Sequence, residues 1–175
     1  MVDISTTKIR DVMRIALRPF GDARGVFKET YHLAQYSAAG IGGPFVQDNV
    51  SVSARGVLRG MHWDPRLSKL TQVLHGTTYH VLADMRRGSP TFRTWESFEL
   101  DAGLHEQLFV PAGVANGFLV LSETAVVHYR QTAYYDPSSE RTLRWNDPFV
   151  SIHWPTTDPI LSEKDGTTPD YLPSE

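Results

Sequence analysis

The sequence predicts an all-β fold, a β-sandwich or β-barrel with few helices. Short runs rich in β-branched and aromatic residues recur along the 175 residues, and Gly, Pro and Asp punctuate these runs. Many short strands at regular spacing are typical of two packed sheets or of one closed sheet. The pattern alone leaves three architectures open: the jelly roll, the immunoglobulin-like sandwich and the lipocalin-type barrel.

The expected strands follow one another with short connections. The first alternates in polarity, and the next two flank His75-Gly76, which resembles a hairpin turn. Weak helical or turn signals occur only at 33–40 and 101–105. The expected strands are 45–53, 69–74, 77–85, 92–100, 106–110, 117–121 and, the longest, 124–135.

The chain has the length and composition of one globular domain. Apolar residues make up 41% and charged residues 21% of it, which is ordinary for a protein with a full core. No repeat, linker or low-complexity segment divides it. We therefore expect a single domain over residues 1–175.

Composition excludes several classes of protein. The chain has no cysteine, which excludes disulfides, thiolate catalysis and zinc–sulfur sites. The net charge of −3 provides no general attraction to nucleic acid or to an anionic membrane, so neither is expected as a partner. No apolar run approaches the ~18 residues that a membrane helix needs, and the first residues lack a signal-peptide pattern. We therefore expect a cytoplasmic protein.

One stretch is unusually polar for a strand-rich protein. It holds an arginine, a histidine and a lysine within eleven residues, and two amide side chains precede it. Such cations are costly to bury unless a ligand or a partner compensates them. A solvated edge strand would explain the same pattern, and the spacing does not decide between the two. The residues are Gln47, Asn49, Arg59, His62 and Lys69.

A series of motifs along the chain resembles the dTDP-4-dehydrorhamnose 3,5-epimerase family. The resemblance implies a cupin-type jelly-roll β-barrel or sandwich with a few short helices and with its site inside the barrel. It also implies a core over roughly 40–150, N- and C-terminal segments that pack on it, and a homodimer. The motifs are GDARGVFKE at 21–29, GVLRGMH at 56–62, SPTF at 89–92, VPAG at 110–113, YYDP at 134–137, WNDP at 145–148, IHWP at 152–155 and LSEKD at 161–165.

The resemblance implies an isomerase that inverts carbons beside the ketone of a nucleotide-linked 4-keto-6-deoxy sugar, in deoxysugar biosynthesis. Such a carbon can lose its proton because the carbanion spreads onto the ketone oxygen as an enolate. Inversion then needs a base on one face, an acid on the other and a positive group at the oxygen, without cofactor or metal. By resemblance these roles fall to His62 as base with Asp165 as its partner, Tyr129 as acid and Lys69 at the oxygen.

The same resemblance implies how the nucleotide sugar is held. Arginine recognises diphosphate oxygens in a bidentate manner, which suits Arg24 and Arg59. An aromatic ring can stack on the base, and polar side chains can hydrogen-bond it or reach the phosphates. These further binding residues are Phe27, Glu29, Gln47, Asn49 and Lys164.

The chain departs from the family pattern near the site. Asn116 stands where the family has a second histidine, and His80 stands where it has that histidine's aspartate, so the two changes look like a re-paired couple. Asn116 can donate a hydrogen bond to an enolate oxygen but cannot shuttle a proton. Arg130 replaces a lysine after the tyrosine, and the loop before Lys69 is short. The short loop resembles a branch of the superfamily that acts on GDP-linked 4-keto heptoses, so the nucleotide, the sugar length and the number of centres inverted stay open.

Other classes of function remain as alternatives. In a metal-dependent cupin oxygenase, His62, Asp64 and His128 would form a site of two histidines and one carboxylate. Strand alternation opposes this, because His128 and Tyr129 must point to opposite faces. A non-catalytic sugar-binding module would not need the base, the lysine and the acid together. A ketoisomerase with the same fold and nucleotide preference is the closest enzymatic alternative, and the retained Tyr129 and Asp165 favour epimerisation over it.

Overall fold

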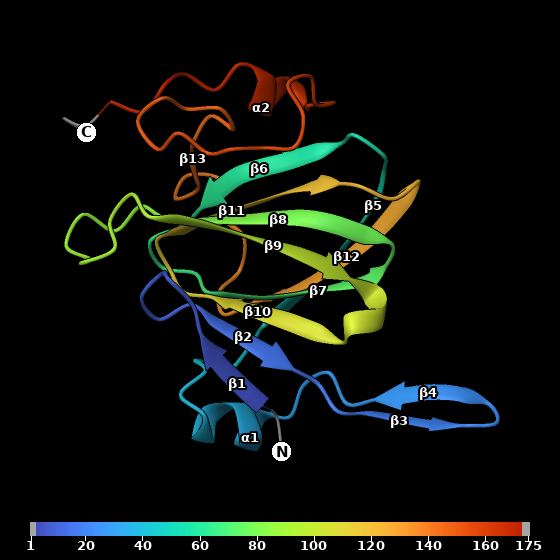
Figure 1. Ribbon diagram of the computed structural model, residues 1–175. Helices are drawn as coiled ribbons and strands as arrows, with labels where there is room; N and C mark the ends of the chain where they lie inside the picture. The colour runs from blue at the N-terminus through green and yellow to red at the C-terminus, as the bar shows by residue number, and fades with distance from the viewer. Residues whose placement is uncertain (1–2, 173–175) are drawn as a thin grey trace.

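Two antiparallel sheets face each other in the computed structural model, which describes residues 3–172 (Figure 1). The first two residues of the N-terminal stretch and the last three of the chain lie outside the described residues. The larger sheet has the strand order β1-β2-β10-β7-β12-β5 and the smaller has the order β13-β6-β11-β8-β9. The predicted all-β class, a two-sheet jelly roll with a few short helices, is confirmed.

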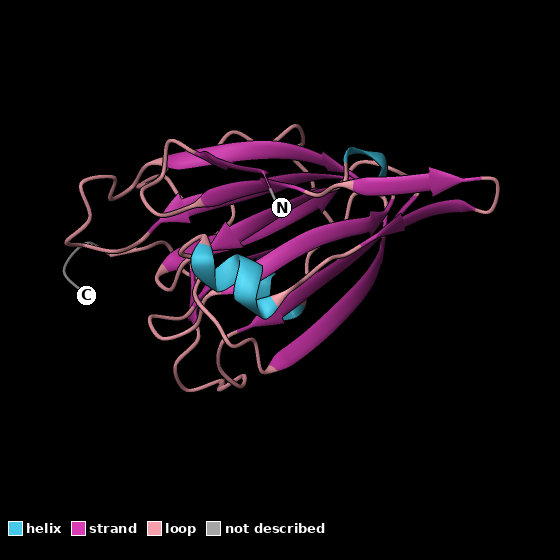
Figure 2. Ribbon diagram, turned by 90° about the horizontal axis from the view of Figure 1, so that it is seen from below, coloured by secondary structure: helices cyan, strands magenta, loops and turns pink. Residues whose placement is uncertain are grey.

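The strands of the larger sheet are β1 (Asp3–Thr6), β2 (Met13–Ala16), β5 (Gln47–Ala54), β7 (Lys69–His75), β10 (Glu106–Val110) and β12 (Thr124–Gln131). Those of the smaller sheet are β6 (Leu58–Trp63), β8 (Thr77–Asp84), β9 (Trp95–Asp101), β11 (Val114–Val120) and β13 (Arg141–Thr142). A separate hairpin, β3 (Pro19–Asp22) with β4 (Gly25–Lys28), projects from the body of the molecule (Figure 2).

The short helices lie outside the strands. They are α1 (Leu33–Ala38), the 3₁₀ turn η1 (Ala102–Leu104) and α2 (Glu163–Gly166), and the first two match the weak signals in the sequence. Asp101 caps η1, because its side chain accepts a hydrogen bond from the Gly103 amide. Among residues 3–172 no helix has the length and apolar character to cross a membrane.

The predicted hairpin at His75-Gly76 is wrong. β7 pairs with β10 and β12, whereas β8 pairs with β9 and β11, so the turn carries the chain from one sheet to the other. Gly76 has a φ of +72°, and a Cβ there would lie 2.1 Å from the Thr124 carbonyl oxygen. The turn therefore requires glycine, but a tight turn between two apolar runs looks the same in sequence whether it stays within a sheet or leaves it.

Four predicted strands differ from the observed strands by two or more residues at one end. The strand expected from residue 45 begins at Gln47, because Phe45 packs edge-on against Tyr31 instead. The strand expected to reach residue 135 ends at Gln131, opposite the first residues of β5 and β7. The strand expected from residue 92 begins at Trp95, after a loop that bonds the N-terminal segment. β6 was expected only as a polar stretch, and β11 begins three residues before the predicted 117.

Apolar clusters fill the space between the sheets and cover both outer faces. The inner cluster includes Val73, Leu82, Leu108, Phe118 and Val127, each at most 5% exposed. The N-terminal segment and α1 cover the larger sheet, and the segment after β13 covers the smaller one. Burying one such side chain is worth about 1.5–3 kcal/mol, so the inner cluster makes a rigid support for the strands that line the cavity.

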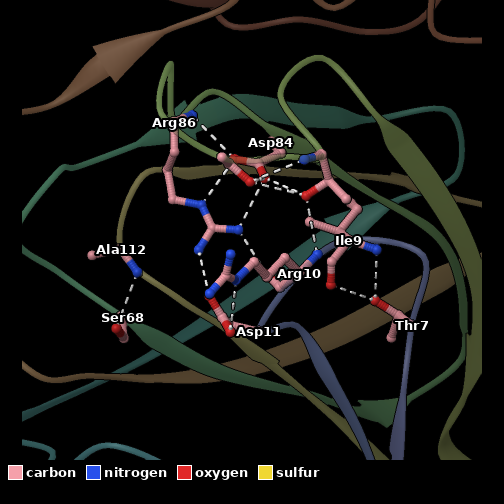
Figure 3. A network of polar contacts seen from close by, with 10 residues as sticks. Thr7, Ile9, Arg10, Asp11, Ser68, Asp84, Arg86 and Ala112 are labelled. Atoms are coloured by element: carbon pink, nitrogen blue, oxygen red, sulfur yellow. Dashed lines mark hydrogen bonds and ion pairs between the residues drawn. The ribbon is translucent and has the colours of Figure 1, made fainter.

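A buried carboxylate fixes the loop between β8 and β9 (Figure 3). Asp84 is fully buried and accepts hydrogen bonds from the Arg86 guanidinium at 2.9 Å, Ser89 Oγ at 2.6 Å and Thr91 Oγ1 at 2.7 Å. Burial works to raise the pKa of Asp84, but these partners together hold it below its usual range. Arg86 also donates to the Arg10 carbonyl at 2.6 Å, which ties in the N-terminal segment. The SPTF motif at 89–92 therefore has a structural role, because its Ser89 and Thr91 hold this loop to Asp84.

Candidate active site

A cavity of about 440 Å³ opens between the two sheets. β5, β7 and β12 line it from the larger sheet, β6 and β11 line it from the smaller one, and the segment before and within α2 closes one side. Six of the residues singled out in the sequence line this cavity. They are Arg59, His62, Lys69, Asn116, Tyr129 and Asp165.

His62 and Asp165 form a close pair although 103 residues separate them. His62 Nε2 lies 2.6 Å from Asp165 Oδ1, and Asp165 is 5% exposed. The Gly60 amide donates to the other carboxylate oxygen at 3.4 Å, and Ser162 Oγ accepts from the Asp165 amide at 3.1 Å at the start of α2. Burial works to raise the pKa of Asp165, but the hydrogen bond and charge of His62, with the Gly60 and Ser162 contacts, hold it below its usual range. The carboxylate is therefore ionised and fixes one ring nitrogen of His62.

Lys69 and Tyr129 face this pair from the opposite sheet. Lys69 Nζ lies 5.7 Å from the centroid of the Tyr129 ring, within the range of a cation–π contact. Burial lowers the pKa of Lys69, an effect that the carboxylates of Glu140 and Asp64 oppose. Burial also raises the pKa of Tyr129, with Glu140 adding to the effect and Arg59 opposing it. At neutral pH the phenol therefore keeps its proton and is available as an acid.

Strand alternation along β12 separates Tyr129 from its neighbours. His128 and Arg130 contact Asp48 on the other face, at 3.8 Å and 3.5 Å. The Asp64 carboxylate, the third ligand of the metal-dependent alternative, forms an ion pair with Arg66 and accepts a hydrogen bond from Ser139 Oγ. Within residues 3–172 no three His, Asp or Glu side chains come together as a metal-binding group. The geometry therefore does not assemble the ligand set that the metal-dependent alternative requires.

A second pocket, of about 330 Å³, adjoins the cavity and shares His62 and Tyr129 with it. Gln47 and Asn49 line it and hydrogen-bond each other at 3.0 Å. Lys164 forms an ion pair there with Glu140, whose hydrogen bond raises the pKa of Lys164. Glu140 lies in the loop between the YYDP and WNDP motifs, and no signal in the sequence distinguished it.

Several polar atoms in the two pockets have no partner within the described part of the chain. In the cavity these include Ser51 Oγ, Thr71 Oγ1 and Asn116 Oδ1, and in the adjoining pocket Asn49 Nδ2 and Gln131 Nε2. A buried polar atom without a hydrogen bond costs about 1–3 kcal/mol. Their concentration here indicates a polar ligand with several hydroxyl or carbonyl groups. No signal in the sequence distinguished Thr71.

Three predicted binding residues lie outside both pockets. Arg24 and Phe27 belong to the projecting β3–β4 hairpin, where the Arg24 side chain is 90% exposed and Phe27 is 72% exposed (Figures 1 and 2). Arg24 pairs with Asp22 of the same hairpin, and Glu29 accepts a hydrogen bond from Gln35 at 3.3 Å. A single chain therefore does not bring Arg24, Phe27 or Glu29 to the cavity.

The comparison with protein families identifies this arrangement. Residues 6–172 match the family model described as dTDP-4-dehydrorhamnose 3,5-epimerase. The chain belongs to this family. It is 48% identical to a dTDP-4-dehydrorhamnose 3,5-epimerase of Pseudomonas aeruginosa over 90% of this chain and 89% of the relative. A dTDP-4-dehydrorhamnose 3-epimerase of Streptomyces niveus is 36% identical over 90% of this chain and 78% of its own length. The protein is therefore an epimerase, related to both 3,5- and 3-epimerases.

Solved structures of family members have the same fold. The dTDP-4-dehydrorhamnose 3,5-epimerase of Bacillus anthracis, with TDP and pyrophosphate bound, has a TM-score of 0.93 at 39% identity and covers 98% of this chain and 100% of its own. The dTDP-6-deoxy-D-glucose-3,5-epimerase of Legionella pneumophila, in complex with dTDP-4-keto-L-rhamnose, has a TM-score of 0.90 at 39% identity and covers 95% of this chain and 90% of its own. These neighbours place the epimerase in the cupin-type jelly-roll class.

Proposed function

We propose that this epimerase inverts carbon centres beside the ketone of a dTDP-linked 4-keto-6-deoxy sugar, with His62 as base and Tyr129 as acid and without a cofactor. The observation that carries the proposal is that the two groups reach one cavity from opposite sheets. A proton can therefore leave one face of a sugar ring bound between them and return to the other face.

His62 starts the reaction by removing the proton beside the ketone. With Nε2 held by Asp165, Nδ1 is the nitrogen that takes the proton. The ionised, buried carboxylate stabilises the imidazolium that forms, as carboxylates do in other His–Asp pairs. The electron pair of the broken C–H bond moves onto the ketone oxygen, which becomes an enolate oxygen.

Lys69 stabilises that oxygen. A cation already in place at a developing negative charge needs no reorganisation during the reaction, and in a buried site its effect is larger than in water. Lys69 belongs to β7, whose next cavity-lining residue, Thr71, presents a hydroxyl that has no hydrogen-bond partner within residues 3–172. The strand therefore offers a positive group and a neutral hydrogen-bonding group along one side of the ring.

Tyr129 completes the inversion by donating its phenolic proton to the carbanion from the other face. Its raised pKa keeps the proton on the phenol until the enolate forms. The resulting phenolate lies near the Lys69 ammonium, which lowers the cost of its charge. The Tyr129 phenolate then regains a proton from solvent, since the cavity is open.

The choice of dTDP follows the relatives rather than the departures near the site. The ligands named with the solved relatives are TDP and a dTDP-linked 4-keto sugar. The short loop before Lys69, which resembles a GDP-heptose branch, is the reason for testing a GDP-linked sugar beside the dTDP-linked one. Relatives of both the 3,5- and the 3-epimerase kind leave one or two inverted centres as outcomes of the same test.

We also propose that the nucleotide is held at the interface of a homodimer. Phe20, Val26 and Phe27 of the hairpin are 55–72% exposed, and so are Val50 and Val52 on the outward face of β5, at 61% and 64%. β5 is the edge strand of the larger sheet, and it lines the cavity through Ser51. A second copy that covers this edge would bury both apolar surfaces and bring Arg24, Phe27 and Glu29 to the partner's cavity.

Proton–deuterium exchange tests the reaction directly. The purified protein is incubated in heavy water with dTDP- and GDP-linked 4-keto-6-deoxy sugars, and NMR follows loss of the signals at the two carbons beside the ketone. We expect exchange with the dTDP-linked sugar, followed by an inverted product. Absence of exchange with both sugars would overturn the proposal, and exchange with the GDP-linked sugar alone would overturn the choice of nucleotide.

A further inference from the structure

Two polar atoms without partners among the described residues lie at the cavity wall and just behind it. His80 Nε2 on β8 and Asn116 Oδ1 on β11 are both buried and lack a hydrogen bond within residues 3–172. β8 and β11 pair directly, with His80 opposite Phe118, so Asn116 and His80 are diagonal neighbours on one face of the sheet. Each buried atom costs free energy while it lacks a hydrogen bond, and a hydrogen bond between the two atoms would remove both costs.

The imidazole of His80 is held on its other sides. Its Nδ1 lies 3.2 Å from Thr78 Oγ1, and Thr78 is itself fully buried. The ring stacks on Phe118 with 5.2 Å between centroids and 23° between planes. The ring therefore keeps its orientation, and only the position of its proton remains to be decided.

Charge and burial keep that ring neutral. Burial lowers the pKa of His80 to about 3, Asn116 opposes this as a hydrogen-bond partner, and the charge of Lys69 adds to it. Asn116 is close enough to His80 to influence its pKa, although Asn116 Oδ1 and His80 Nε2 do not reach full hydrogen-bond geometry. In a neutral ring one nitrogen donates and the other accepts.

The two tautomers have opposite consequences for Asn116. A proton on Nε2 is donated to Oδ1 and directs the amide nitrogen to the cavity, whereas a proton on Nδ1 leaves Nε2 as an acceptor and directs Oδ1 to the cavity. The Thr78 hydroxyl can donate to Nδ1, so the first arrangement leaves both ring nitrogens with a partner. Asn116 also lies opposite His62 in the pairing of β11 with β6, so its cavity-facing end is beside the base.

We propose that His80 is a positioning residue whose Nε2–H bonds Asn116 Oδ1 and directs the Asn116 amide N–H groups into the cavity as neutral donors to the sugar's enolate oxygen. This inference rests on the proposed epimerisation. It gives the oxygen one cationic donor, Lys69, and one uncharged donor that does not change with pH. It also explains why the histidine and the asparagine occur together.

The tautomer can be measured without any substrate. Long-range ¹H–¹⁵N correlation spectra of the ¹⁵N-labelled protein distinguish the two neutral tautomers of a histidine, and His80→Gln assigns the signal. We expect His80 to carry its proton on Nε2 throughout pH 5–8, and Asn116→Leu to shift its Nε2 resonance. A proton on Nδ1, or titration of His80 within this range, would overturn the proposal.

Kinetics test the positioning role. Asn116→Leu removes the donor and should lower kcat for exchange about 10²-fold, as loss of an oxyanion donor does. His80→Leu leaves the amide unfixed and should lower kcat by roughly tenfold, a part of that effect. In His80→Gln the side-chain amide can donate in place of Nε2 and should restore kcat to within about threefold of wild type. KM should change by less than about twofold in all three variants.

The two arms separate the possible failures. If the wild type exchanges no label with either sugar, the proposed function fails, while the NMR experiment still decides the tautomer. Equal losses in His80→Leu and His80→Gln, or a wild-type rate in both, would contradict positioning through Asn116. Circular dichroism checks that each variant is folded.

Discussion

The cavity and the β3–β4 hairpin differ in how completely one chain forms them. In the cavity, the His62–Asp165 pair is fixed at 2.6 Å, and the groups proposed for catalysis are supported by a close-packed core. In the hairpin, Arg24 and Phe27 are exposed and contact neither pocket. Both regions carry motifs of the same family, yet one is preorganised within the chain and the other is not.

The difference indicates a division of work. Proton transfer requires groups held at fixed positions, which a rigid barrel provides. Nucleotide recognition tolerates contribution from a second chain, because stacking and ion pairing depend less on exact alignment. We therefore expect substitutions in the cavity to lower kcat and substitutions in the hairpin to raise KM.

The largest effect is expected for the base. His62→Asn removes the group that takes the proton and should lower exchange at every centre by about 10²–10⁴-fold, the usual contribution of a general base. Exchange in heavy water measures it, and thermal unfolding serves as the check on folding. Exchange within threefold of wild type would place the base elsewhere.

Lys69→Met should have the next largest effect. Loss of the buried cation at the enolate oxygen should lower kcat by roughly 10²–10³-fold, while the affinity for dTDP measured by calorimetry changes little. If nucleotide binding is lost and kcat is preserved, Lys69 is a phosphate ligand. The cavity would then bind the nucleotide as well, and the proposed separation of roles between cavity and hairpin would be wrong.

Tyr129→Phe should separate the two halves of the reaction. The ring still fills its place, so His62 should continue to exchange the substrate proton from its own face. Inverted product should decrease by about 10²-fold because the opposite face has lost its acid. NMR measures label and epimer in the same sample. A parallel decline of both would assign Tyr129 to binding or to the first step.

A smaller effect is expected in the hairpin. Phe27→Ala removes a stacking surface worth about 1–3 kcal/mol per base, so KM should rise by roughly tenfold or more with kcat unchanged.

Mixing inactive His62→Asn chains with chains carrying both Arg24→Ala and Phe27→Ala should then restore activity, because one site per mixed dimer is complete. No restoration after subunit exchange, confirmed by mass spectrometry, would refute a site shared between chains.

The smallest effect on activity is expected at Asp84, which belongs to neither region. Its pKa is lowered in the fold, so its ionised form stabilises the protein above the unfolded pKa of about 3.9 and loses this effect as pH falls through the folded pKa. Asp84→Asn should therefore lower the Tm at pH 7, and the difference from wild type should shrink below pH 4. The kcat at pH 7 should stay within twofold.

The sequence predicted much of this molecule because strand patterns and motifs are local. The patterns over residues 45–53 and 124–135 predicted two strands of the cavity, and strand alternation correctly separated His128 from Tyr129. The family resemblance named six residues that do line the cavity. These features depend on residue type and spacing, which the sequence contains in full.

The tertiary structure decided what depends on contacts between distant segments. Gly76 looked like a hairpin turn, but pairing with β10, β11 and β12 placed its two strands in different sheets. Glu140 reached Lys164 and the second pocket only through folding of the C-terminal segment. The side chains of the hairpin are exposed because the rest of the chain folds away from it, which the residues of the hairpin alone do not specify. The sequence by itself thus determined the all-β class, the family and the residues proposed for catalysis. The fold determined which of these residues lie in contact, because a contact between distant segments depends on the positions of both partners.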